Sequence, residues 1–127
     1  MIHEEICTYE VAKLAKEKGF PQDVFGTYEM TSSCYLEDGR FYKDGCIYPI
    51  ENAYTAPTQS LLQRWLREEK NIHIAVFPNL RNSYEYDWIV YIKGKECWLP
   101  TYSALNDFPT YELALEDALK YALENLV

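Results

Sequence analysis

Apolar residues recur every three to four positions in three stretches of the chain, the spacing that gives a helix one buried face. These stretches are residues 8–21, 57–70 and 109–127. Thr8, Thr58 and Thr110 stand at their starts, where a hydroxyl can accept a hydrogen bond from a free backbone N–H of the first turn. Gly19 follows the first stretch and suits the left-handed residue that closes a helix. The pattern predicts three amphipathic helices.

Directly after Asn71, a residue suited to a left-handed stop, the apolar period changes from 3.6 to 2. We therefore predict a strand that ends at Pro78. One of its faces carries Ile72, Ile74 and Val76, and the other carries His73, Ala75 and Phe77.

Two Asp-Gly pairs between residues of good strand propensity indicate tight turns. A two-residue turn at Asp38-Gly39 would place Glu37 opposite Arg40 and Leu36 opposite Phe41. The second pair is Asp44-Gly45, and the segment between the pairs is so short that one of the two turns is expected to be a looser loop.

The clearest hairpin signal lies in residues 83–100, where polar and apolar positions alternate. Its two expected faces are Tyr84, Tyr86, Trp88, Val90 and Ile92 on one side, and Glu85, Asp87 and Lys93 on the other. A two-residue turn at Gly94-Lys95 would pair Lys93 with Glu96, Ile92 with Cys97, Tyr91 with Trp98 and Val90 with Leu99.

These elements predict a single α+β domain over residues 1–127, in the order α-β-β-(β)-α-β-β-β-α. Short connections between strands favour an antiparallel sheet of five to six strands, with the three helices packed mainly on one face.

Composition narrows the function classes. Hydrophobic residues make up 48% of the chain and no stretch of eighteen apolar residues occurs, so we expect no membrane span. A formal net charge of -8 opposes binding to a phosphate backbone, so no nucleic-acid partner is expected. The acidic N-terminus is unlike a signal peptide, which predicts a cytoplasmic protein with reduced, semi-buried thiols at Cys7, Cys34, Cys46 and Cys97.

Three segments, TYEVAKLAKEKGF, APTQSLLQRWLREEKNIHI and TYELALEDALKYAL, resemble small uncharacterised proteins of phages and integrated mobile elements of gut Bacteroidales. The segments occur in the same order and span nearly the whole chain, although residues 27–49 match no pattern of that group. The resemblance implies a small bacterial or viral cytoplasmic protein and carries no catalytic motif.

The chain has no phosphate-binding glycine loop, paired CxxC, HExxH or GxSxG motif. Cys34, His73 and Asp87 are a conceivable nucleophile, base and orienting acid, but His73 fits a partly buried strand position better. Zinc has donors in the four cysteines, His3 and His73, yet no short knuckle supplies two of them. We therefore expect no enzyme, no catalytic or metal residues and no cofactor.

Twelve tyrosines and three tryptophans make contact with another protein the favoured function. The candidate interaction surface consists of Tyr91, Trp98, Tyr84 and Tyr86. Its expected partner is a second copy in a homo-oligomer or a host protein. The alternatives are a small-molecule or peptide binding domain, with its cleft between the helix at 57–70 and the sheet, and an acidic inhibitor that mimics nucleic acid.

Overall fold

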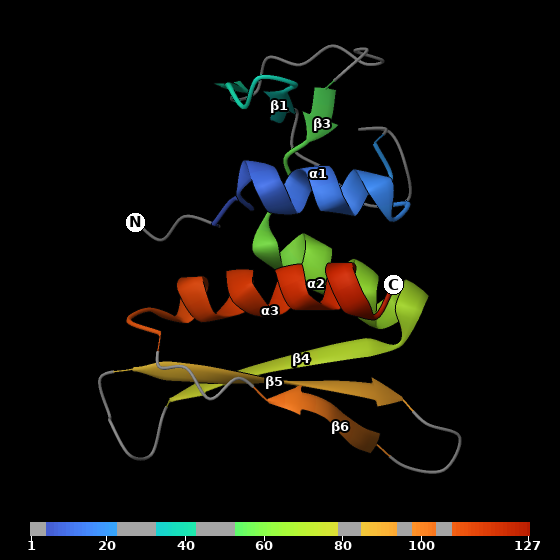
Figure 1. Ribbon diagram of the computed structural model, residues 1–127, viewed down its shortest axis with the longest axis vertical. Helices are drawn as coiled ribbons and strands as arrows, with labels where there is room; N and C mark the ends of the chain where they lie inside the picture. The colour runs from blue at the N-terminus through green and yellow to red at the C-terminus, as the bar shows by residue number, and fades with distance from the viewer. Residues whose placement is uncertain (1–4, 23–32, 43–52, 79–84, 94–97, 104–107) are drawn as a thin grey trace. The chain divides into compact units, whose positions relative to one another are not determined.

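The computed structural model describes residues 5–22, 33–42, 53–78, 85–93, 98–103 and 108–127 (Figure 1). The chain divides into two compact units, residues 1–62 and 63–127, and each is described by itself. Whether the whole chain acts as one domain stays a prediction.

The first unit opens with α1, Tyr9–Glu17, and both predicted ends of this helix are confirmed. The Thr8 hydroxyl accepts a hydrogen bond from the N–H of Val11 at 3.4 Å. Gly19 has φ 97°, and the N–H groups of Gly19 and Phe20 donate to the carbonyls of Lys16 and Ala15. Phe20 is buried, so the chain folds back onto the last turn as a glycine-closed helix requires.

Strands β1, Cys34–Leu36, β2, Phe41–Tyr42, and β3, Ala53–Thr55, form an antiparallel sheet in the order β2-β1-β3. Tyr35, rather than Leu36, lies opposite Phe41, so the predicted register is wrong by one residue. The turn holds three residues because only Gly39 in it has a positive φ, 90°, whereas a two-residue turn of this kind needs two such residues. The second turn, Asp44-Gly45, lies outside the described residues.

Side chains occupy the outer edge of β3. Gln22 Oε1 accepts from the N–H of Thr55 at 2.8 Å, and Lys16 Nζ donates to the carbonyl of Ala53 at 3.0 Å. These backbone groups are therefore already bonded and do not face a further strand. In the same unit Tyr35 donates through its hydroxyl to the Cys7 carbonyl at 2.6 Å, which fixes the start of α1 to the sheet.

Helix α2, Gln59–Lys70, crosses the boundary between the two units. Thr58 caps it, as predicted, by accepting from the N–H of Leu61 at 3.2 Å. Asn71 ends it with φ 57°, and β4, Ile72–Pro78, follows at once. The predicted change from helix to strand is confirmed at this residue.

In the second unit, β4 pairs antiparallel with β5, Tyr86–Lys93, and β5 pairs with β6, Trp98–Ser103. Trp98 lies opposite Lys93, so the predicted Tyr91 and Trp98 pair is wrong by two positions. Four residues separate β5 from β6 in place of the predicted two, and the register shifts again between Val90 and Tyr91. A longer connection moves the pairing along the strand by an even number, which is why the sequence pattern alone did not reveal it.

Helix α3, Tyr111–Asn125, packs against β4 and β5. Thr110 caps it by accepting from the N–H of Leu113 at 3.1 Å. Trp88 of β5 is 1% exposed and donates through its indole N–H to Asp117 Oδ2 at 2.9 Å. Asp117 is half-buried, and its carboxylate accepts this hydrogen bond from the core.

The predicted α+β class with three helices and antiparallel strands is confirmed. A single sheet of five to six strands is wrong, since the described strands form two separate three-stranded sheets. In the first unit, Gln22 and Lys16 hold the outer backbone groups of β3, so no further described strand extends that sheet at this edge.

Candidate interaction interface

The β4-β5-β6 sheet has two unequal faces. On the α3 side, Ile72, Trp88 and Val90 are buried. On the other side, alternate residues of β4 and β5 lie side by side, with His73 paired to Tyr91 and Ala75 paired to Ile89. Figure 1 shows α3 on one side of this sheet. Within residues 71–127, the structure describes no helix on the opposite side.

We name this second side the open face and define it by His73, Ala75, Phe77, Ile89 and Tyr91. Phe77 is 37% exposed, and Ala75 is exposed as well. The other three side chains are half-buried. Large apolar side chains that keep contact with water on a sheet face are typical of surfaces that bind another protein.

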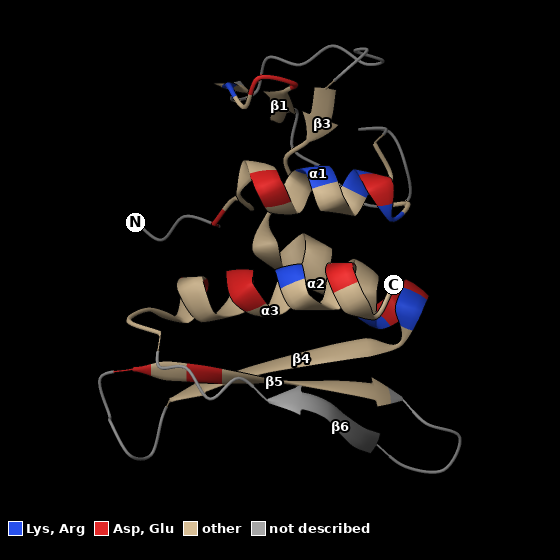
Figure 2. Cartoon of the chain, viewed as in Figure 1, with Lys and Arg blue, Asp and Glu red and all other residues tan. Residues whose placement is uncertain are grey.

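The β4 half of this face is uncharged. No residue of β4 is Lys, Arg, Asp or Glu, which leaves the strand without charged colour in Figure 2. Asp87 stands in the same row of β5, opposite Phe77, but it is buried and its carboxylate accepts from the N–H of Trp88 at 2.8 Å. The acidic side chains of α3 belong to the other side of the sheet.

Of the four predicted surface residues, the structure describes the side chains of Tyr91 and Tyr86, and these lie on opposite sides of the sheet. Tyr91 lies on the open face, opposite His73. Tyr86 has the parity of Trp88, and its ring packs edge-to-face on Tyr111 at 6.0 Å between centroids. Trp98 begins β6, and Tyr84 lies outside the described residues. Sequence reasoning missed Ala75 and Phe77 as surface residues, although the alternation of β4 already places them on one side.

The conceivable catalytic set is not assembled. Cys34 is disulfide-bonded, so its sulfur is no thiolate nucleophile, and the predicted reduced state is wrong for this residue. Cys7 is buried and is not disulfide-bonded. His73 and Asp87 share the open side, but Asp87 pairs with Phe77, four residues along β4, which separates them by roughly 13 Å.

The described residues lack two further features. They contain no group of three or more His, Cys, Asp or Glu side chains placed to hold a metal ion. They also contain no helix of the length and apolar character needed to cross a membrane.

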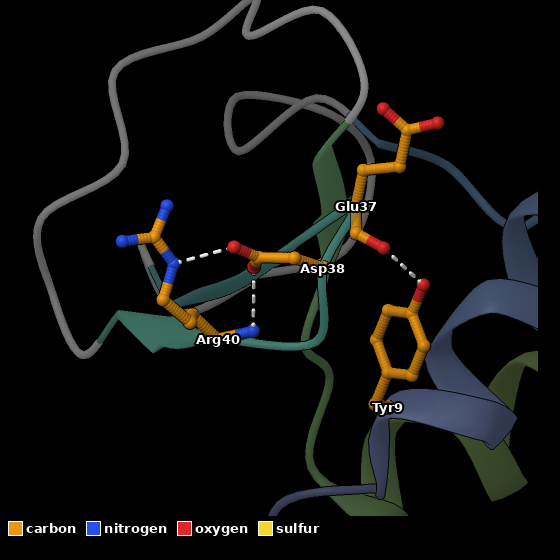
Figure 3. Close-up of polar contacts among 4 residues, drawn as sticks. All are labelled: Tyr9, Glu37, Asp38 and Arg40. Carbon is orange, nitrogen blue, oxygen red and sulfur yellow. Dashed lines mark hydrogen bonds and ion pairs between the residues drawn. The ribbon is translucent and has the colours of Figure 1, made fainter.

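The β1-β2 turn of the first unit carries the clearest charge contact (Figure 3). Asp38 accepts from the backbone N–H of Arg40 at 3.0 Å and from its guanidinium Nε at 2.7 Å. The backbone hydrogen bond from Arg40, followed by the charge of that residue, holds the pKa of the Asp38 carboxyl below its ordinary value of 3.8. Tyr9 donates to the carbonyl of Glu37 at 2.7 Å, which ties the turn to α1. These contacts complete a turn and gather no reactive group.

Comparison with known proteins supplies no family. No protein-family model, no curated protein and no solved structure matches the chain.

Proposed function

We propose that this protein is a non-enzymatic interaction protein of phage or mobile-element origin that binds a host protein through the open face. The observation that carries the proposal is the exposure of Phe77 and Ala75, on a strand without charged residues, beside half-buried Ile89 and Tyr91. The origin rests on the resemblance of the three sequence segments.

The shape and charge of the face define the partner. A small ligand is usually held in a concave pocket, whereas adjacent strands offer a broad surface that suits a second protein. Because the chain has a net charge of -8, a partner with an apolar patch and a neutral or basic surround meets the least repulsion. Attraction of the surrounding charges would speed encounter, and the apolar centre would supply the affinity.

The experiment uses the full chain as bait in lysate of the native host. Tyr91→Thr and Ile89→Thr remove apolar area from the open face while keeping a residue that favours strands. Leu113→Gln is the matched control, because Leu113 is a 51% exposed apolar residue on α3, away from the face.

We expect one host protein to bind the wild type and the Leu113→Gln variant. After purification of that protein, the two β5 variants should weaken its dissociation constant at least about tenfold in calorimetry, as loss of a central apolar contact does. Equal affinity for all four forms, or weakening by Leu113→Gln alone, contradicts the proposal.

A further inference from the structure

β4 is an edge strand of this sheet, so some of its backbone N–H and carbonyl groups point away from β5. In an antiparallel sheet, the N–H and carbonyl of one residue point to the same neighbouring strand, and successive residues alternate. Which residues of β4 point outward therefore follows from any residue of β5 whose direction is known.

Tyr86 fixes that direction. Both its N–H and its carbonyl bond to Phe108, at 2.8 and 2.9 Å, so Tyr86 points away from β4. Alternation then turns Asp87, Ile89 and Tyr91 toward β4, where their partners are Phe77, Ala75 and His73. The backbone groups of Ile72, Ile74 and Val76 consequently point to the open edge.

A second observation agrees. The side chain of Gln63 donates from Nε2 to the carbonyl of Ile74 at 3.0 Å, as an outward-facing carbonyl permits. A carbonyl oxygen has two lone pairs, so this contact leaves one free. In the described part of the chain no strand pairs with β4 on this side.

Two other sheet edges have features that oppose pairing. At the edge of β3 the single N–H of Thr55 is already bonded to Gln22, whereas the Gln63 contact on β4 takes only one lone pair of a carbonyl. β6 contains Pro100 and a register shift. Prolines, charges and irregularities of this kind prevent unwanted strand addition. β4 has seven residues, no charged residue, and proline only at its last position.

We propose that β4 pairs with β4 of a second copy of this chain, antiparallel and about a two-fold axis at Ala75. Ala75 is the central residue of β4, so this register pairs the whole strand: Ile74 meets Val76 of the second copy, and His73 meets Phe77. Every pair that forms is uncharged, which allows association despite the net charge of -8. The two sheets become one six-stranded sheet, and two open faces lie side by side.

The inference goes beyond the proposed function and does not require it, because the dimer forms without a host protein. The residues that test it also differ. Tyr91→Thr changes the central strand and should leave the dimer intact, although it weakens the host complex.

Charge exchange at Ala75 is the direct test. Ala75→Glu or Ala75→Lys alone places two like charges at the two-fold axis and should raise the dimer dissociation constant at least about tenfold in sedimentation equilibrium. An equal mixture of the two variants places opposite charges there and should restore association to within about tenfold of the wild type. Ala75 is exposed, so each single variant should keep the wild-type circular dichroism spectrum.

Amide hydrogen exchange gives a readout that does not depend on a variant. In the wild-type dimer, the N–H groups of Ile74 and Val76 should exchange slowly, and dilution to monomer should speed them without affecting Ala75 and Phe77. A wild type that stays monomeric up to about 1 mM overturns the inference, as does a dimer insensitive to the Ala75 charges. Fast exchange of Ile74 and Val76 in the dimer, or pairing of β4 with a peptide of another protein in place of a second copy, overturns it as well.

Discussion

Replacing Trp88 with alanine should lower the free energy of unfolding by about 3–5 kcal/mol, the usual cost of truncating a buried tryptophan. The side chain is 1% exposed and packs its ring on Tyr121 at 5.4 Å between centroids. Its removal leaves a cavity between β5 and α3, and it also leaves the half-buried carboxylate of Asp117 without its indole donor. Urea denaturation followed by circular dichroism measures the loss.

Trp88→Phe separates the two contributions. Phenylalanine keeps most of the ring packing and loses the hydrogen bond, so we expect a smaller loss of about 1–3 kcal/mol. Combining Trp88→Phe with Asp117→Ala should cost less than the sum of the two single changes, because both remove the same hydrogen bond. If Trp88→Ala lowers the free energy of unfolding by less than about 1 kcal/mol, Trp88 is not central to the core of the second unit.

Reduction of the disulfide at Cys34 should lower the free energy of unfolding of the protein by about 2–4 kcal/mol, since a crosslink restricts the unfolded chain. The sheet of this unit consists of strands of two and three residues, and Cys34 is fully buried in it. A small core of this kind depends more on a crosslink than a large one does. Thermal unfolding with and without a phosphine reductant measures the effect.

The variant Cys34→Ala should melt at one temperature whether or not reductant is present. Cys7→Ala provides the control, because Cys7 is buried and not disulfide-bonded, and its replacement should preserve the reductant effect. Identical melting of the wild type in both conditions would rule out a stabilising crosslink.

The same disulfide bears on location. Disulfides persist mainly in oxidising compartments and are rare in the cytosol. Cytoplasmic location, expected from an acidic N-terminus and reduced thiols, therefore stays a prediction and loses the support of Cys34.

The helices could be predicted because their ends are determined by residues that lie close together in the sequence. Thr8, Thr58 and Thr110 each accept a hydrogen bond from an N–H three positions ahead. Gly19 and Asn71 adopt the positive φ that their residue types favour. None of these contacts depends on a distant part of the chain.

Strand pairing was less predictable because it depends on connections and on distant side chains. The turn at Gly39 needs one positive φ, and a local reading of Asp-Gly assumed two. Gln22 bonds to the edge of β3 from 33 positions away in the sequence. No residue near β3 signals this contact, so the sequence pattern did not predict that β3 is an edge strand.

The candidate site was predictable in part. The alternation of β4 correctly separates Ile72 from Ala75 and Phe77. It does not tell which side a helix will cover, because both sides carry apolar residues. The burial of Asp87 and the hydrogen bond of Asp117 were also missed. A carboxylate among polar residues is expected to face water unless its hydrogen-bond partner is known.

Hydroxyl-radical footprinting of the free protein, at a concentration where it is monomeric, tests the open face most directly. The account predicts strong oxidation of Phe77 and measurable oxidation of Tyr91, with Trp88 protected although tryptophan is the more reactive side chain. Addition of the host partner should then protect Phe77 and Tyr91 and leave exposed Leu113 oxidised. Protection of Phe77 equal to that of Trp88 in the free monomer would contradict an open face.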